Sequence, residues 1–203
     1  MVRQFLRSIA LLLALALLTA CRGTAPAVVH TEPNKGAPTI PENSFHSPIL
    51  LTSVGQSADV YVTQTLLWQS GMHKLIMAPV VQVEDLTNRY GTLILAVGGS
   101  AKGLGVAGIN FREEFSRTET LISRAEELDI PILAVHLGGQ TRRGEFSDPL
   151  IRLVLDSAAA AIVLSEGDCD DYMLNRILDN GIPVQYVDDP LDTAEVFHSI
   201  FTE

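Results

Sequence analysis

The chain has 203 residues, of which 47% are hydrophobic, and a formal net charge of −10 at pH 7. This length and apolar content are typical of one globular domain with a substantial core. The negative charge would repel both the phosphate backbone of nucleic acids and anionic lipid headgroups. It therefore excludes nucleic-acid binding, and also membrane docking by charge alone.

The first 20 residues have the pattern of a bacterial lipoprotein signal peptide. Arg3 and Arg7 form a basic region, an apolar run spans residues 9–18, and the sequence Leu-Thr-Ala-Cys ends at Cys21. The run is too short to cross a bilayer comfortably, so it indicates a secretory signal. The ending resembles the lipobox, in which the cysteine is lipidated and becomes the new N-terminus. We therefore expect an extracytoplasmic protein of the bacterial cell envelope, held at a membrane by lipid on Cys21 only; the alternative is an ordinary signal peptide with a chance cysteine.

Residues 21–47 are predicted to be the lipidated cysteine and a flexible tether, because prolines lie among small and polar residues without an apolar period. A single domain is predicted over residues 48–203. Without Arg3 and Arg7 the 14 basic residues fall to 12 against 24 acidic ones, a formal charge of −12. If Cys21 is lipidated, Cys169 has no partner, so the domain is expected to contain no disulfide.

Apolar runs and helical patterns alternate along the predicted domain. Strands are predicted over 49–54, 75–78, 92–97, 130–136, 159–164 and 183–187. Helices are predicted over 58–70, 84–90 (a short turn), 111–128, 148–157, 168–180 and 192–200, and the glycine-rich residues 98–108 between them are interpreted as a loop. The alternation predicts an α/β fold, a three-layer, doubly wound parallel sheet that is flavodoxin-like, with about six strands in the order 2-1-3-4-5 and the sixth at the edge.

The predicted helix over 111–128 has the clearest amphipathic pattern. Its apolar face carries Phe111, Phe115, Thr118, Ile122 and Ala125. Its other, charged face carries Arg112, Glu113, Arg117, Arg124 and Glu127, which we expect to face solvent.

Three segments of the domain carry a family resemblance. They read ILLTSVGQSADV (49–60), LILAVGGSAKGLGVAGI (93–109) and IPILAVHLGGQTRRG (130–144). Together they resemble the marker segments of the bacterial domain-of-unknown-function family numbered 6305. The resemblance extends from Pro48 onward. It implies the limits of the domain and a secreted context, and it implies no activity.

The loops after the first, third and fourth predicted strands form the candidate ligand site. In an open parallel sheet, ligands bind beyond the carboxyl ends of the strands, where the winding direction reverses. Nine of the chain's 15 glycines lie in these loops, and glycine lets a backbone approach a ligand closely. The candidate ligand-binding residues are Gly55, Gln56, Ser57, Gly98, Gly99, Ser100, Lys102, Gly103, Gly105, His136, Gly138, Gly139, Arg142 and Arg143.

The positive charges in these loops favour a small anionic ligand. Lys102, Arg142 and Arg143 lie in an otherwise acidic domain, and free backbone N–H groups of the loops are expected to help bind the anion. Adjacent arginines in an extended loop point in opposite directions, so only one of them is expected to face the crevice. Two alternatives stay open: a pocket for a small molecule of another kind, and glycines that serve loop packing alone.

Other site types receive less support from the sequence. The string Gly-Leu-Gly-Val-Ala-Gly at 103–108 follows the third strand rather than the first and lacks the acidic residue about 20 positions later, so we reject a dinucleotide site and expect no cofactor. The acidic residues near 166–171 lack the EF-hand pattern and suit the start of a helix, so no metal site is expected. His136 ends a strand and is the weak candidate for a catalytic residue, without any G-x-S-x-G motif in the chain.

Three functional hypotheses follow from the sequence. The favoured one is a lipoprotein domain that binds a small anionic molecule. The second is a hydrolase or transferase that uses His136. The third is a module that binds another envelope protein and no small ligand. Binding is favoured over catalysis, and the sequence alone does not decide between them.

Overall fold

The computed structural model describes residues 33–202 of the protein. The predicted signal peptide over 1–20, the predicted lipidation of Cys21 and the first part of the predicted tether lie outside these residues. Within them, no helix combines the length and the apolar character needed to cross a membrane.

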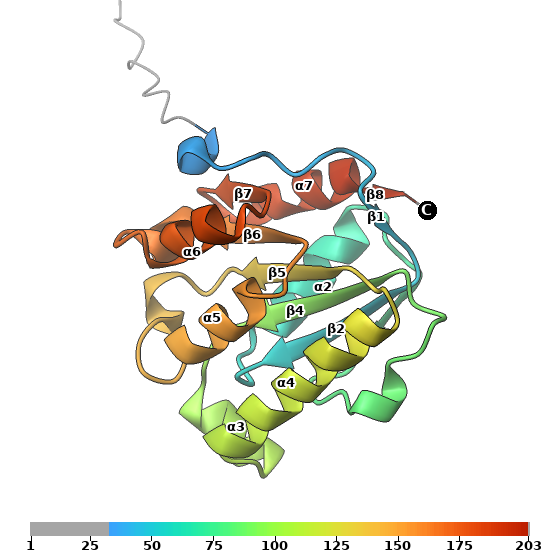
Figure 1. Cartoon of the computed structure of the whole chain (residues 1–203), viewed down its shortest axis with the longest axis vertical. Coiled ribbons are helices and arrows are strands. Elements are labelled where there is room, and N and C mark those ends of the chain that lie inside the picture. Colours follow the sequence, from blue (N-terminus) through green and yellow to red (C-terminus); the bar gives the residue numbers. More distant parts are fainter. Residues whose placement is uncertain (1–32, 203) are drawn as a thin grey trace, which may run out of the picture. The chain divides into compact units, whose positions relative to one another are not determined.

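Six parallel strands form one sheet in the order β3-β2-β4-β5-β6-β7 (Figure 1). Their bounds are β2 (Ile49–Val54), β3 (Leu75–Met77), β4 (Thr92–Val97), β5 (Ile132–His136), β6 (Ala160–Leu164) and β7 (Val184–Val187). Numbered along the sheet's own strands, this is the order 2-1-3-4-5-6, so the predicted flavodoxin-like order is confirmed. The winding direction reverses between β2 and β4.

Within residues 33–202, six helices cover the two faces of the sheet and one end of it (Figure 1). Their bounds are α2 (Asp59–Gln69), α3 (Ala101–Ala107), α4 (Phe111–Glu127), α5 (Asp148–Leu155), α6 (Tyr172–Asn180) and α7 (Thr193–Ile200). Helices α4, α5 and α6 pack on one face and α2 and α7 on the other, which gives the predicted three layers.

The strands are apolar on both sides because both faces of the sheet are covered. In β4, Leu93 and Leu95 belong to the core under α4, whereas Ile94 and Ala96 belong to the core under α2. All six residues of β4 are buried. Continuous apolar runs are therefore the expected signature of these strands, and the six predicted strands are found close to their predicted limits.

Local side-chain contacts fix where two of the helices begin. Asn110 accepts a hydrogen bond from the Glu113 backbone N–H, and the Glu113 carboxylate accepts one from the Asn110 N–H, so α4 begins at Phe111. The predicted helix over 168–180 begins later, at Tyr172. Asp168 lies before it, and its buried carboxylate accepts hydrogen bonds from the first turn of α6.

Short 3₁₀ helices connect several of these elements. They are η1 (Pro33–Gly36), η2 (Val83–Asp85), η3 (Gly139–Arg142), η4 (Ser165–Asp168) and η5 (Pro190–Asp192). The helical turn predicted over 84–90 is in fact the single 3₁₀ turn η2. Its helix ends at once because Leu86 has extended backbone angles.

The glycine-rich segment after β4 contains a helix, α3, where the sequence indicated only a loop. The Ser100 hydroxyl accepts the backbone N–H of Gly103 and starts the helix, and Gly108, with φ of 69°, ends it. A Cβ atom at Gly103 would lie 1.8 Å from the carbonyl oxygen of Gln56. Glycine at 103 is therefore required for α3 to pack against the loop after β2.

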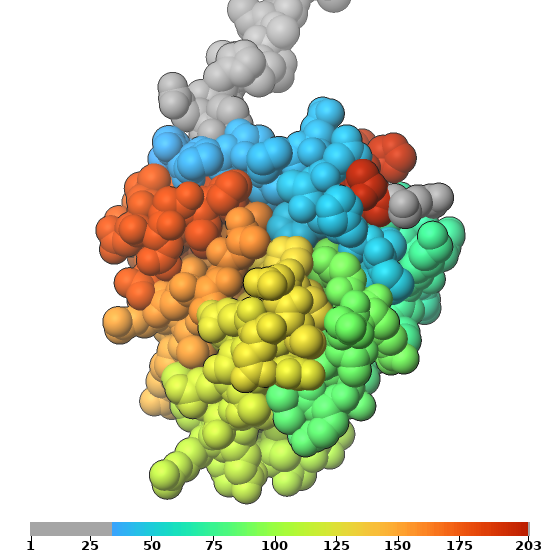
Figure 2. Space-filling view, turned by 45° about the vertical axis from the view of Figure 1, so that its right-hand side comes forward, coloured from blue at the N-terminus to red at the C-terminus, as the bar shows by residue number. Residues whose placement is uncertain are grey.

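Residues 33–47, which we call the strap, pack onto the domain instead of forming part of a tether. Ala37, Ile40 and Phe45 are buried. Strand β1 (Phe45–His46) pairs in parallel with β8 (Phe201–Thr202). Figure 2 shows the blue residues of the strap against the orange and red C-terminal part of the chain. The domain therefore begins well before Pro48, and the predicted tether is wrong over this stretch because isolated apolar residues fill gaps there without any period.

Polar contacts hold the other end of the strap. The Asn34 side chain accepts the backbone N–H of Tyr186, and the Lys35 ammonium contacts the Asp171 carboxylate at 2.8 Å. The Pro38 carbonyl accepts the N–H of Val184, so the strap also hydrogen-bonds to the start of the last strand of the sheet.

We expect Phe45→Ala to lower the free energy of unfolding by about 3–5 kcal/mol, because it empties a fully enclosed site in the core. The Phe45 ring packs 5.7 Å from that of Phe201, between ring centroids. Urea unfolding checks this, with Glu42→Ala, an exposed position of the same strap, as the control. An effect of Phe45→Ala as small as that of the control would contradict the packing role of the strap.

Candidate functional site

The loops after β2, β4 and β5 meet at the carboxyl edge of the sheet. The Gly98 N–H donates to the Val54 carbonyl and the Ser100 N–H to the Gly55 carbonyl, both at 2.8 Å. The third loop joins them through Arg142, whose Cβ would lie 3.4 Å from a Cβ atom placed on Gly98. The strand order thus brings together the three loops that the sequence singled out.

The glycines of these loops serve close packing, and several of their N–H groups are already engaged. The Gly55 N–H donates to Glu114 at 2.7 Å, the Gly99 N–H to Ser147 at 2.8 Å and the Gly103 N–H to Ser100 at 3.0 Å. The prediction that free backbone N–H groups of the loops help to bind the anion is therefore wrong for these glycines. These three N–H groups are therefore not available to an anion.

Other predicted glycines leave room for nearby side chains. A Cβ atom at Gly138 would lie 2.0 Å from the Cγ atom of Arg142, and one at Gly139 would lie 2.1 Å from the Glu166 carboxylate. Gly105 alone among the predicted glycines of α3 faces open space, with nothing within 4 Å of such an atom.

A buried carboxylate from α4 holds the loop after β2 in place. Glu114 is fully buried, and its Oε1 atom accepts hydrogen bonds from the Gly55 N–H and the Gln56 side-chain amide. Gln56 has a positive φ of 60°, which a residue other than glycine rarely adopts. The contact to Glu114 helps to fix this unusual backbone turn.

Arg117 completes this network, although the sequence placed it on the solvent face. Its guanidinium donates to both oxygens of Glu114 at 2.8 Å and to the carbonyls of Ser53 and Val81 at 2.6 and 2.9 Å. Its side chain is only 8% exposed. The ion pair therefore ties α4 to the end of β2 and to the segment that follows β3.

A hollow of about 470 Å³ lies between the start of α2 and α3. We call it the α2–α3 hollow. It is lined by Gln56, Ser57, Ala58, Tyr61, Pro79, Val80, Ser100, Lys102, Gly103, Val106, Ala107 and Arg142. Six of the predicted residues line it, including Gly103 from the glycine string. Its lining contains two cations and no acidic side chain.

Sequence reasoning missed the apolar part of this lining. Tyr61 and Val106 are 53% and 82% exposed, although each lies in a helix that begins at the carboxyl edge of the sheet. Val106 is four residues after Lys102, one helical turn along the same face of α3. Apolar residues at solvent-facing positions of these two helices were the signal that could have identified this apolar part of the lining.

Arg142 is held at the hollow by packing and by one ion pair. Its Nε atom lies 3.4 Å from an oxygen of Asp59, and that oxygen also accepts a hydrogen bond from the Ser57 hydroxyl at 2.8 Å. The same Nε atom is buried and has no hydrogen-bond partner in the described structure. Its guanidinium makes no other ion pair within residues 33–202. Lys102 is exposed.

Arg143 points away from the hollow, as predicted for one of two adjacent arginines. It forms ion pairs with Asp148 at 2.8 Å and Asp170 at 2.9 Å, and its guanidinium lies 4.9 Å from the centre of the Tyr172 ring. Burial acts to lower the pKa of Arg143, but hydrogen bonds to the two carboxylates outweigh it and raise the pKa. Arg143 therefore joins η3 to α5 and α6.

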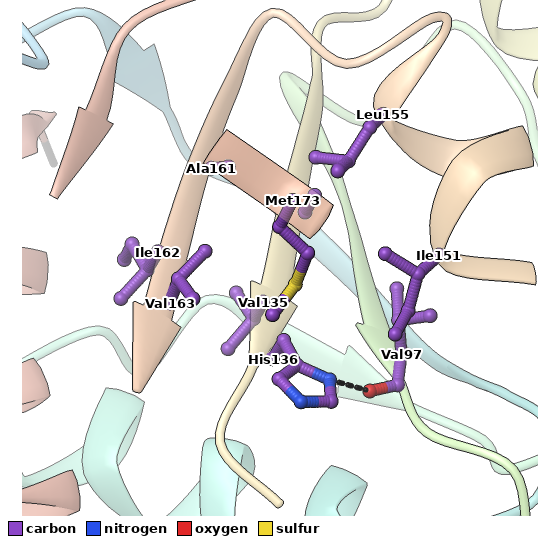
Figure 3. A pocket seen from close by; sticks show the side chains of 10 residues that line it. Val97, Val135, His136, Ile151, Leu155, Ala161, Ile162, Val163 and Met173 are labelled. Carbon is purple, nitrogen blue, oxygen red and sulfur yellow. Dashed lines mark hydrogen bonds between the residues drawn. The ribbon is translucent and has the colours of Figure 1, made fainter. Parts of the chain in front are cut away.

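His136 is buried in the sheet and does not line the hollow (Figure 3). Its Nδ1 atom lies 2.9 Å from the Val97 carbonyl, whereas its Nε2 atom is buried without a hydrogen-bond partner in the described region. The ring lines an enclosed apolar cavity of about 10 Å³, the lower limit for one water molecule. Burial lowers the pKa of His136, and the hydrogen bond to Val97 opposes this in part.

The serines that could work with His136 are engaged elsewhere. The hydroxyl of Ser53 donates to the Ser57 carbonyl, and that of Ser57 donates to Asp59. The Ser100 hydroxyl accepts at the start of α3. Among the residues with described positions, none of these serines hydrogen-bonds to His136.

The acidic residues of η4 and its surroundings have partners within the protein. Asp168 accepts hydrogen bonds from the backbone at the start of α6 and from the Tyr186 hydroxyl, Asp170 pairs with Arg143, and Asp171 pairs with Lys35. In the part of the chain covered by the structure, no three His, Cys, Asp or Glu side chains form a group that could hold a metal ion. Cys169 is exposed and forms no disulfide there.

Comparison with known proteins gives a family and no function. A family model described as a domain of unknown function, DUF6305, matches residues 46–201. The match begins within β1 of the strap and ends within β8, so it spans the whole six-stranded sheet. No curated protein matches the chain.

We expect Glu114→Ala to lower the free energy of unfolding by about 3–5 kcal/mol, because it leaves the buried Arg117 charge unpaired. Glu127→Ala is the matched control, since it removes another Arg–Glu pair three residues apart in α4, whose side chains are 37% and 65% exposed. The control should cost no more than about 1 kcal/mol. Equal losses in urea unfolding would mean that the buried network does not hold the loop after β2.

We expect acid to destabilise the protein partly through His136. Its folded-state pKa lies below the ordinary value of 6.5, so the unfolded chain binds a proton more readily once the pH falls below that value. The contribution is complete above about pH 6.5 and is lost as the pH falls, by at most about 1.4 kcal/mol per pH unit. Unfolding free energies at pH 7.5 and 5.0 should therefore differ less in His136→Gln than in the wild type. The exposed His73→Gln serves as control, and an unchanged pH dependence in His136→Gln would refute the expectation.

Proposed function

We propose that this chain, which belongs to the DUF6305 family, binds a small anionic solute in the α2–α3 hollow. The supporting observation is the charge of the lining. Lys102 and Arg142 both border the hollow, and no carboxylate does. In a chain with 24 acidic residues, a concave surface whose only charged lining residues are two cations attracts anions selectively.

The two cations would play different parts in binding. Arg142 is oriented by Asp59 and by the neighbouring glycines, so it presents a fixed guanidinium. Lys102 is exposed, and its long side chain can follow the ligand. At 4 Å in a partly solvated site, one such charge attracts an anion by roughly 4 kcal/mol before the cost of desolvation.

The expected location outside the cytoplasm suggests what binding of the solute is for. A domain anchored outside the cytoplasm by lipid on Cys21 would capture a solute, sense it, or deliver it to a membrane partner. The edge of the sheet where the winding reverses is also where doubly wound folds generally bind ligands. We propose no enzymatic role for His136, because it is buried outside the hollow.

A protein partner is the second candidate function, and the outer face of α2 favours it. Tyr61, Val62 and Trp68 are 53%, 43% and 50% exposed there, and no charged residue follows Asp59 in the helix. Native mass spectrometry of the freshly purified protein separates the two candidates. A bound small molecule supports the first, and a stoichiometric protein without a small molecule supports the second.

We expect Lys102→Ala and Arg142→Gln each to weaken binding of the cognate anion about tenfold, equivalent to about 1.4 kcal/mol. Calorimetry with the anion found by native mass spectrometry, or by a thermal-shift panel of carboxylates and phosphate esters, measures this. Without ligand, both variants should unfold within about 0.5 kcal/mol of the wild type.

Lys74→Ala is the matched control, because it removes an exposed lysine that precedes β3, at the opposite end of the strands. Its affinity should equal that of the wild type, and added salt should weaken binding in both proteins. Unchanged affinity in Lys102→Ala and Arg142→Gln would remove the support for the proposed anion site.

A further inference from the structure

The size of the α2–α3 hollow points to an organic ligand. Its volume of about 470 Å³ corresponds to roughly 15 water molecules, at about 30 Å³ each. Pockets for small organic molecules typically measure about 300–1,000 Å³. An inorganic anion would contact the cations and leave most of the hollow filled with water.

The apolar wall of the hollow calls for a ligand with an apolar part. Tyr61, Val80 and Val106 come from three separate segments and face the same space. Val106 is 82% exposed, so a ligand held against it would cover apolar surface that now faces water. Since Val106 lies one helical turn from Lys102, an anionic group at the lysine places the rest of a small ligand against the wall.

The local charge selects among anionic groups. Lys102 and Arg142 contribute two positive charges, and the Asp59 carboxylate beside Arg142 offsets one of them. The remaining single charge matches a monoanion. A phosphate monoester carries about −1.5 to −2 at pH 7, which would leave excess negative charge in an already acidic protein. A carboxylate carries one negative charge and suits the planar guanidinium of Arg142.

We infer that the ligand is an organic monocarboxylate with a compact apolar body, bound with its carboxylate at Lys102 and Arg142 and its body against Tyr61 and Val106. This inference rests on the proposed function and narrows it to one ligand class. Because the two parts of the ligand contact different residues, each part can be tested separately.

The test uses the full chain, purified in a mild detergent, and calorimetry with five probes. Hexanoate and benzoate carry both the carboxylate and an apolar body. Acetate lacks the body, benzamide lacks the charge, and phenyl phosphate carries the larger charge. We expect hexanoate or benzoate to bind at least tenfold more tightly than acetate, benzamide and phenyl phosphate.

Variants then separate the two ends of the ligand. Tyr61→Ala should weaken hexanoate or benzoate binding three- to tenfold and leave acetate binding unchanged. Lys102→Ala should weaken all the carboxylates. Trp68→Ala is the matched control, because Trp68 is an equally exposed aromatic residue of α2 that does not line the hollow. Thermal unfolding of each variant shows that it is folded.

The outcomes distinguish this inference from the proposed function. If acetate or phenyl phosphate binds as tightly as hexanoate and benzoate, and Lys102→Ala still weakens binding, the ligand class is wrong and the anion site stands. The class is also wrong if Tyr61→Ala affects hexanoate and benzoate no more than Trp68→Ala does. If no carboxylate binds, the inference is overturned. If probes bind equally well to Lys102→Ala, the proposed function fails as well.

Discussion

The buried ion pair between Glu114 and Arg117 is the contact on which the carboxyl edge of the sheet depends. A charged pair without water needs most of its hydrogen-bonding positions filled, or its burial costs more than its attraction returns. Here the partners are supplied by the backbone and one side chain of the loops themselves: the N–H of Gly55, the amide of Gln56 and the carbonyls of Ser53 and Val81. The pair thus forms hydrogen bonds with loop groups that would otherwise need water, and these bonds hold the loops in one conformation. The floor of the α2–α3 hollow rests on that structure, since Gln56 lines it.

Most of the fold could be predicted from the sequence because its strands are apolar on both faces. An apolar run such as residues 92–97 is expected to be buried on both faces. Because such runs alternate with helices along the chain, a parallel sheet covered by helices on both faces is the expected arrangement. The convergence of the three loops followed from strand order alone. The two adjacent arginines point apart as predicted, with Arg142 at the hollow and Arg143 on Asp148 and Asp170, although Arg142 ends the 3₁₀ helix η3 and only Arg143 has extended backbone angles.

The features that sequence could not supply depend on contacts between distant segments. Each glycine in a helix costs about 1 kcal/mol relative to alanine, so local preference argued against α3. A side chain at position 103 would clash with the Gln56 carbonyl, so packing between the two loops requires glycine there in spite of that cost. Arg117 belongs to the charged face of its helix in the sequence. Only the packing of α4 against the end of β2 shows that its side chain is buried. The strap has no period because Ile40 and Phe45 fill separate gaps in the core beneath α2 and α7.

The packing of the Arg142 side chain against Gly138 affects the entropy of binding of any molecule that contacts Arg142. The arginine side chain lies so close to this glycine that no Cβ atom would fit between them, and Asp59 holds its Nε end. Part of its rotational freedom has therefore already been lost during folding, whereas ordering a free arginine on association costs about 0.5–1.5 kcal/mol. Lys102 is exposed and forms no ion pair within residues 33–202, so the incoming molecule must immobilise it. Two residues with equal charge would thus contribute unequally to the entropy of association, and glycine at position 138 sets that inequality.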